Sequence, residues 1–352
     1  MHPFFGFCLT FIVGGIGFLL FRRCRIPNPA MLGSMATTGA LNIFGLFPDF
    51  STAFVSFGAS LLIGVMIGRQ IDRTVFSRVL ELGRPIFFQM VGIFALSLVS
   101  GYALLLMGRG EVTPITALIS GAAGGISEMI LFGMSINADV AMVAFVHLFR
   151  VVIFLSLIPY IAIVSEKLGG GKPGEGRQRS VRKQPRPFAK FDYVLLGASA
   201  LSGALLGEWL NIPSGMLVGA MIASGVFALF INKRYRFSAN LRYVAQIGLG
   251  IALGERMTPE IMAQLGQMLL PSFVVTAIML IGCILLAFLL RANTGWDLTT
   301  CLVCSAPAGL SQVVVYADEI GADSFAVSVF HTVRIICIVS LYPLVIIPLA
   351  GG

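Results

Sequence analysis

Long apolar stretches alternate with short polar connections along most of the chain. Ten of these stretches are candidates for helices that cross roughly 30 Å of hydrocarbon. They cover residues 4–21, 28–47, 53–70, 85–107 and 140–164, and then 193–210, 214–232, 241–255, 271–290 and 324–349. The pattern predicts an all-α polytopic membrane protein.

Two further stretches, 113–135 and 298–317, are interrupted by Gly and Ala. A glycine weakens a helix interior by about 1 kcal/mol relative to alanine and marks where the backbone can turn. Gly124 and Gly125 interrupt the first stretch, and Gly309 interrupts the second. We expect each stretch to form a re-entrant or broken helix.

The chain contains an internal duplication. The sequence "IPNPAMLGSM" from Ile26 overlies "IPSGMLVGAM" from Ile212, an offset of 186 residues. After a slip of two residues, "INADVAMVAFVHLFR" ending at Arg150 overlies "IGADSFAVSVFHTVR" ending at Arg334. We therefore predict two homologous membrane repeats, at 1–165 and 191–352.

A Gly, Pro and Arg-rich segment, 166–190, joins the two repeats, with eight Lys or Arg against two Glu. The chain is 57% hydrophobic and 11% charged, with a net charge of +8, so most of its positive balance is local to this linker. Cytoplasmic retention of positive loops explains such a run, and contact with anionic membrane lipid is an alternative. Because the run lacks interleaved aromatic residues, we expect no direct nucleic-acid binding.

Charge also favours one topology. If the interrupted stretches do not cross, each repeat has five spans, and the basic connections 22–25, 69–84, 166–190 and 233–242 share one side, as the positive-inside rule requires. If they cross, the linker faces the opposite side from 22–25 and 69–84. We therefore expect both termini outside the cytoplasm, a cytoplasmic linker, and a second repeat inverted relative to the first. Interrupted helices of inverted repeats form the central site of many secondary transporters.

The repeats share three ionisable positions within apolar helices, which is a functional-site hypothesis in a membrane protein. They are Asp139, His147 and Arg150 in the first repeat, and Asp323, His331 and Arg334 in the second. Each Asp begins a helix, so it is either an N-terminal cap or a ligand-binding group. Each His is either a proton relay or a packed, hydrogen-bonded side chain.

Each Arg lies about three turns from its Asp, so its partner must come from another segment. Glu128 is the nearest candidate in the first repeat, either as that partner or as a cation or proton site, and its counterpart is Gln312. Ser127 and Ser311 follow the Gly-rich breaks, where free backbone N–H groups can hold an anion. We expect a small-molecule solute near these residues, with an anion favoured over a cation.

The six cysteines include Cys301 and Cys304 in a C-x-x-C arrangement, which suggests redox chemistry or a metal. Their counterparts in the first repeat are Ala117 and Ser120, so small packing residues satisfy the same positions. We expect neither a cofactor nor a metal site.

Two Gly-rich segments, "SGAAGGISEM" and "SAPAGLSQV", are each followed by a helix that contains A-D and H-x-x-R. In these segments the chain resembles the AbrB family of duplicated integral membrane proteins, which are also labelled regulators of the gene aidB or ammonia monooxygenases. The resemblance implies a multi-pass protein of the bacterial inner membrane. Oxidation of ammonia would need a copper or iron site with several convergent ligands, and the chain has three histidines, so we expect no enzyme.

Two functions remain open from the sequence. The first is a transporter-like protein that binds a small solute between the two Gly-rich breaks. The second is a membrane-embedded regulator or sensor that affects gene expression indirectly.

Overall fold

The computed structural model forms helices and no strands among the residues it describes, which are 3–24, 26, 28–46, 53–68, 70–71, 73–108, 112–169, 190–231, 239–259, 266–307, 317 and 320–350. Most of the linker and part of the second interrupted stretch, with Gly309, Ser311 and Gln312, lie outside the described residues. The helices form two compact units, each of which takes segments from both halves of the chain.

Unit 1 contains the first three helices of each half of the chain. They are α1 (Pro3–Arg23), α2 (Pro29–Ile43), α3 (Ala53–Gly68), α9 (Lys190–Trp209), α10 (Gly215–Ile231) and α11 (Ala239–Gly254). Unit 2 contains α4 (Arg73–Glu81), α5 (Gly83–Met107), α6 (Pro114–Gly121), α13 (Leu269–Thr294), α14 (Leu298–Ser305) and α16 (Ser324–Ala350). Two helices, α7 (Ile126–Ser135) and α8 (Val140–Gly169), begin in one unit and end in the other.

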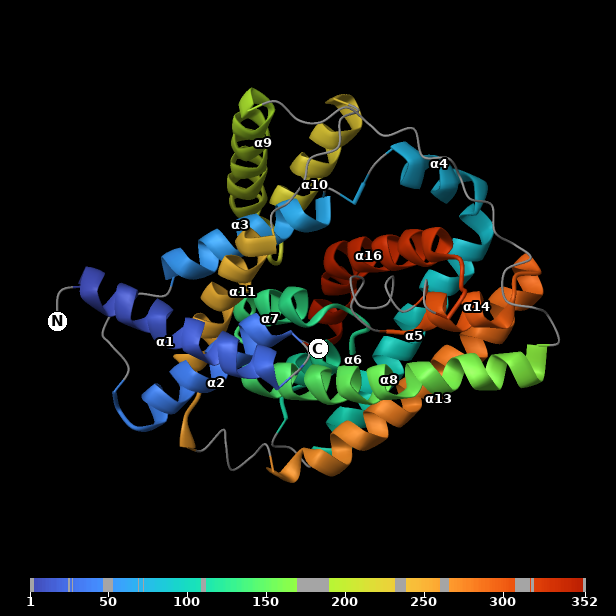
Figure 1. The fold of residues 1–352 in the computed structure, drawn as a ribbon, viewed down its shortest axis with the longest axis horizontal. Helices are drawn as coiled ribbons and strands as arrows, with labels where there is room; N and C mark the ends of the chain where they lie inside the picture. The colour runs from blue at the N-terminus through green and yellow to red at the C-terminus, as the bar shows by residue number, and fades with distance from the viewer. Residues whose placement is uncertain are drawn as a thin grey trace. The chain divides into compact units, whose positions relative to one another are not determined.

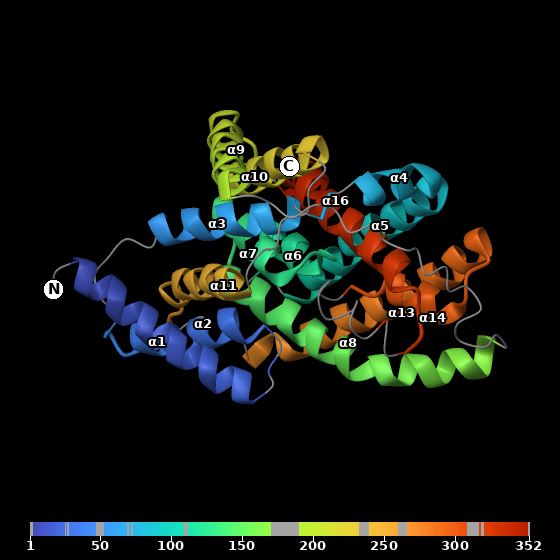
Figure 2. The ribbon, with the colours of Figure 1, turned by 45° about the horizontal axis from the view of Figure 1, so that its top comes forward.

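Glycines set the close helix pairs of unit 1. The pairs α1 and α2, and α9 and α10, lie side by side in both views of the ribbon (Figure 1 and Figure 2). A Cβ on Gly17 would overlap the backbone of Gly33, and a Cβ on Gly203 would overlap that of Gly219. Small residues let the backbones of membrane helices approach closely.

The two halves of the chain also pack against each other inside unit 1. Helix α3 packs on α10, where Gly64 lies against the backbone of Leu217. Helix α11 packs on α2, where Gly250 lies against the backbone of Met31. The core of unit 1 is therefore shared between helices from both halves.

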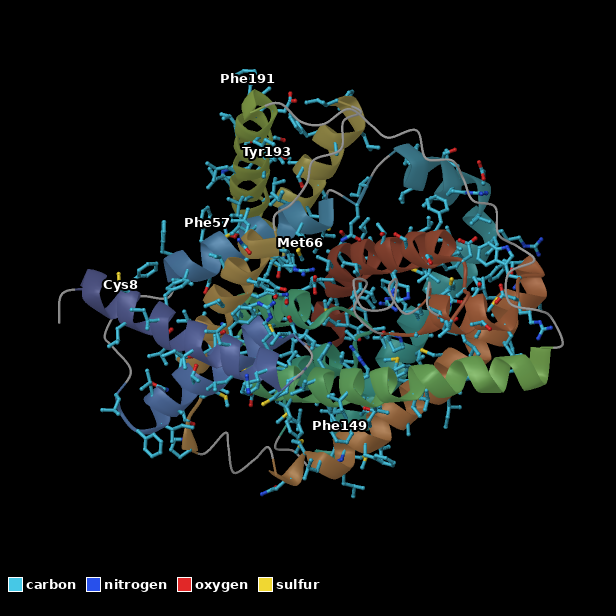
Figure 3. The ribbon with its side chains drawn as sticks, viewed as in Figure 1. Cys8, Phe57, Met66, Phe149, Phe191 and Tyr193 are labelled. Carbon is cyan, nitrogen blue, oxygen red and sulfur yellow. The ribbon has the colours of Figure 1, made fainter. Side chains whose placement is uncertain are left out.

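Four helices are long and apolar enough to cross a membrane, and they are α1 from Gly6 on, α5, α13 and α16. Much of the remaining apolar surface faces outward, including Phe191 and Tyr193 on α9 (Figure 3). The four long helices and the exposed apolar side chains indicate a membrane protein, because an apolar surface of this extent is stable only in contact with lipid.

Other expected spans are shorter helices in the structure. Helix α2 has 15 residues, α3 and α11 have 16 each, and α10 has 17. Backbone turns set several of these ends: Asn28 precedes α2 with φ 52°, Gly45 follows it with φ 68°, and Ser214 precedes α10 with φ 54°. The apolar pattern continues through such left-handed positions, so it overstates the length of the helix.

Candidate functional site

Both interrupted stretches contain a helix that ends where the Gly and Ala run begins. Helix α6 ends at Gly121, and its cap residue Ala122 is extended, with φ −65° and ψ 136°. Helix α14 ends at Ser305, and Ala306 is extended in the same way, with φ −64° and ψ 125°. The first stretch is therefore broken as predicted, whereas the predicted interruption at Gly309 lies outside the described residues. The last carbonyl groups of each short helix need partners from elsewhere.

Arg150 supplies partners at the first break. It donates from Nη1 to the carbonyl of Ala122 at 2.7 Å and from Nη2 to the carbonyl of Gly124 at 3.2 Å. Its side chain is 1% exposed. The end of a helix carries partial negative charge, so the guanidinium caps α6 electrostatically as well.

Arg334 does the same at the second break. Its Nη1 donates to the carbonyl of Ala306 at 2.6 Å, and its side chain is 2% exposed. Its Nη2 lies 3.2 Å from Nδ1 of His331, whose Nε2 lies 2.9 Å from the carbonyl of Val303. Because a guanidinium can only donate, Nδ1 accepts and Nε2 carries the proton. The network assigns a neutral His331 that orients Arg334, which favours the hydrogen-bonded role over the proton relay.

The structure differs from the sequence expectation for the partner of Arg150. Within the described part of the chain, no ion pair joins Glu128 to Arg150 or Arg334. Backbone carbonyls take the place of a carboxylate, because the break leaves them free at the position that Arg150 reaches. The two guanidinium groups are near enough to repel each other electrostatically.

Glu128 lies in the first turn of α7, just after the break, and is 8% exposed. Its carboxylate covers Gly125, where an added Cβ would overlap it. It is near enough to Arg334 to attract it electrostatically. Gly125 therefore makes room for the acidic group, and Ser127 is buried beside it.

Both aspartates cap helices, which is one of the two roles that the sequence left open. Asp139 accepts from the backbone N–H groups of Ala141 and Met142 at 3.0 and 3.1 Å. Asp323 accepts from the backbone N–H groups of Phe325 and Ala326 at 2.9 and 3.0 Å. Asn137 and Gly321 precede them with φ 55° and 75°, so each helix begins after a left-handed turn.

Helix α5 was predicted as a span, but its hydrogen bonds to both breaks were not. Ser97 accepts a hydrogen bond from the backbone N–H of Ala123 at 3.0 Å in the first break. Gln89 donates to Ser305 at 2.8 Å at the end of α14. Both are buried polar residues within a predicted apolar span, and that placement was the available signal.

Tyr342 was also missed. It is fully buried on α16 and donates to the carbonyl of Leu118 on α6 at 2.9 Å. Its ring packs edge to face on Phe94 of α5. No signal separated this tyrosine from an ordinary core aromatic.

His147 is buried on α8, one turn before Arg150.

Among the described residues, no group of three or more His, Cys, Asp or Glu side chains gathers as metal ligands would. The buried polar groups of unit 2 are instead two arginines, two histidines, one glutamate, one glutamine and several hydroxyl groups, beside the backbone of two broken helices. Such a site can hold an anion or a hydrogen-bonding solute.

The comparisons with known proteins agree on one family. A family model described as transition state regulatory protein AbrB matches residues 51–350. An Escherichia coli (strain K12) protein, named as the candidate regulator AbrB, is 25% identical over 345 residues, or 96% of this chain and 93% of the relative. A Bacillus subtilis (strain 168) protein, YhjN, named as uncharacterized, is 21% identical over 297 residues, or 80% of this chain and 75% of the relative.

Proposed function

The chain belongs to the AbrB family, and from the helix breaks that this member contains we propose that it is a transporter-like protein of the bacterial inner membrane. Its solute is a small anion bound at the breaks in unit 2. The proposal includes two inverted repeats and no enzymatic activity.

Arg150 carries the proposal. It is buried, it bonds to two backbone carbonyls, and its Nε has no hydrogen-bond partner among the described residues. Burying a charge without a counter-ion costs several kcal/mol. A bound carboxylate or phosphate would supply the missing charge and an acceptor for Nε, and such charge-assisted bonds are among the stronger ones in proteins.

The proximity of Arg334 supports an anion over a cation. The two guanidinium groups repel each other, and Glu128 offers a single carboxylate that attracts Arg334. An anion near both would remove that repulsion, whereas a cation would add to it.

Matched backbone conformations support the two repeats independently of sequence similarity. Asn28 and Ser214 are related by the 186-residue offset, and both adopt positive φ, which is uncommon for residues other than glycine. Asn137 and Gly321 match in the same way after the slip of two residues. Repeats of five spans each would be inverted in the membrane and would suit alternating access.

Reporter fusions test the topology. A cytoplasmic reporter joined at Gly174 should be active, and one joined at the C-terminus should be inactive, with the opposite result for a periplasmic reporter. Both fusions reporting the same side would contradict the inverted repeats.

Binding measurements test the site. We expect small carboxylates to raise the unfolding temperature of the purified full-length protein in detergent, and Arg150→Gln to reduce that response because it keeps an N–H donor and removes the charge. Arg78→Gln is the control, because Arg78 is partly exposed and pairs with Glu81. An unchanged response in Arg150→Gln would contradict the proposed site.

The name of the Escherichia coli relative favours a second candidate, a membrane-embedded regulator. The two functions differ in one measurement. A transporter moves a bound carboxylate into proteoliposomes, whereas a regulator binds it without flux and changes transcript levels when the gene is deleted.

A further inference from the structure

Two aromatic rings join the end of α1 to the beginning of α11 in unit 1. The ring centroids of Phe18 on α1 and Tyr243 on α11 are 4.9 Å apart, and the two helices pack together. Phe18 lies near the last turn of α1, and Tyr243 lies one turn after α11 begins. The two rings therefore connect a helix from the first half of the chain to one from the second half.

An arginine covers each of these rings. The guanidinium carbon of Arg22 is 5.8 Å from the ring centroid of Phe18, and that of Arg242 is 5.5 Å from the centroid of Tyr243. A cation within about 6 Å of a ring centroid is attracted to the face of the ring. Such stacking orients the flat guanidinium group and leaves the N–H groups at its edge available to an acceptor.

No acidic side chain compensates these two charges. Among the described residues, neither Arg22 nor Arg242 has an ion-pair partner. The segments 22–25 and 233–242 together hold seven Lys or Arg and no Asp or Glu. Because positive charges gathered in this way repel one another, an anion that binds between them lowers the electrostatic energy.

Arg78 in unit 2 shows the alternative. It also lies over an aromatic ring, with its guanidinium carbon 5.9 Å from the centroid of Phe325. However, its Nη1 donates to the carboxylate of Glu81 at 2.7 Å. Stacking on a ring therefore occurs with and without an acidic partner, and the pair on α1 and α11 is the one that lacks it.

The surroundings of the two arginines are apolar. Helix α1 is long and apolar enough to cross a membrane and ends at Arg23, so Arg22 lies where the hydrocarbon gives way to the headgroups. Leu19 and Leu20 on α1 and Val244 on α11 are exposed within one turn of the arginine on the same helix. A ligand that combines an anionic group with long apolar chains suits such a surface better than a fully polar anion.

We propose that Arg22 and Arg242 bind the phosphate of an anionic phospholipid, whose acyl chains cover the exposed apolar side chains beside them. Basic sites between membrane helices bind anionic headgroups, and hydrogen bonds between guanidinium and phosphate are among the stronger ones. The lipid links the two halves of the chain within unit 1. This site goes beyond the proposed function, because the proposed carboxylate site belongs to unit 2.

Lipid titrations followed by native mass spectrometry of the purified full-length protein test the site. We expect phosphatidylglycerol to bind more tightly than phosphatidylcholine with the same acyl chains. Arg22→Gln and Arg242→Gln should each weaken the binding of phosphatidylglycerol by about 5-fold. Arg78→Gln is the matched control and should change nothing, because Glu81 already compensates that charge. The basic linker 166–190 is the same in every variant, so lipid bound there contributes equally.

Two further variants separate a specific site from general attraction by positive charge. Arg22→Lys keeps the charge and loses the flat group that stacks on Phe18, so it should bind less tightly than the wild type and more tightly than Arg22→Gln. Tyr243→Leu removes the ring under Arg242 without changing any charge and should also weaken binding. Wild-type affinity in both variants would overturn the site.

The remaining outcomes decide the ligand. Equal affinities for the two lipids, or an unchanged affinity for phosphatidylglycerol in both Arg→Gln variants, would overturn the inference. Displacement of phosphatidylglycerol by excess inorganic phosphate would assign the arginines to a soluble anion and overturn the lipid. Carboxylate binding should be unchanged in Arg22→Gln and Arg242→Gln, so a failure of the proposed carboxylate site and a failure of this lipid site are told apart.

Discussion

The ends of α6 and α14 can be compared residue by residue, because both belong to unit 2 and both are capped by an arginine from 28 residues later in the chain. The caps agree in geometry down to the extended conformation of Ala122 and Ala306. The surroundings differ. The first break pairs Gly121 with the backbone of Gly101, whereas the second has Ser305, which accepts from Gln89.

This difference shows which features a duplicated site keeps. The bond that satisfies the broken backbone is the same in both copies, because either helix would otherwise end in unpaired buried carbonyls. The side chains around the break have diverged, and Glu128 has no acidic counterpart, since residue 312 is Gln. The shared part is structural, and the divergent part is where we expect specificity.

The largest effect should come from making the first break resemble the second. Gly121→Ser places a side chain where the backbone of Gly101 lies, so we expect a loss of about 3 kcal/mol of stability from overpacking. The unfolding temperature of the purified protein measures it. The reciprocal change, Ser305→Gly, removes one hydrogen bond and should cost less; equal losses would mean that the two helix pairs are not packed differently.

Next in size is the loss of one arginine cap. Arg150→Met removes both bonds to the carbonyls of Ala122 and Gly124, whereas Arg150→Gln keeps a donor. We expect the Met variant to be less stable than the Gln variant by about 1–3 kcal/mol, the cost of leaving buried acceptors unpaired. Arg334→Met and Arg334→Gln repeat the comparison at the second break. Similar stability of Met and Gln variants would show that the carbonyl bonds contribute little.

Replacing Glu128, which is Gln at the matching position 312 of the second repeat, should have a moderate effect on carboxylate binding. Glu128→Gln gives both breaks the same side chain and removes the carboxylate that competes with an anion for Arg334. We expect carboxylate affinity to rise by about 3- to 10-fold at neutral pH, a change typical of removing one nearby like charge. Calorimetry measures the affinity, and Gln89→Glu, which adds a carboxylate instead of removing one, is the opposite change. A loss of affinity in Glu128→Gln would place the Glu128 carboxylate among the solute-binding groups.

The smallest effects should come from the aspartate caps. Asp139→Ala and Asp323→Ala each remove a side chain that accepts from two backbone N–H groups, so each should lose about 1 kcal/mol. Asp139→Asn and Asp323→Asn keep the cap and should be nearly neutral. A large loss of carboxylate binding in either Asn variant, with stability unchanged, would instead assign the charge to the solute site.

The first break could be predicted from the sequence, and the caps as one of two alternatives, because both depend on local signals. Gly124 and Gly125 interrupt an apolar stretch, and Asn137 with Asp139 is a turn followed by an N-cap. Each of these features is decided within a few residues, so the chain around it carries the information.

The partners of the arginines could not be predicted in the same way. Every residue has a backbone carbonyl, so nothing in the sequence marks Ala122 or Ala306 as the acceptor. The roles of Ser97 and Gln89 on α5 depend on which helices pack together, which is decided by distant glycines such as Gly101 and Gly121. The two compact units escaped prediction for the same reason, because each gathers helices from both repeats.

The spacing between each arginine and its acceptor also bears on how the protein is made. An arginine at the centre of a helix costs about 2.5–3.5 kcal/mol when the helix is inserted alone. Because Ala122 and Ala306 precede Arg150 and Arg334 by 28 residues, their carbonyls have already been synthesised when the charged helix follows. At about 5–20 residues per second, the arginine arrives within a few seconds of its acceptor. The order of the chain thus lets each broken helix receive its arginine during insertion into the bilayer.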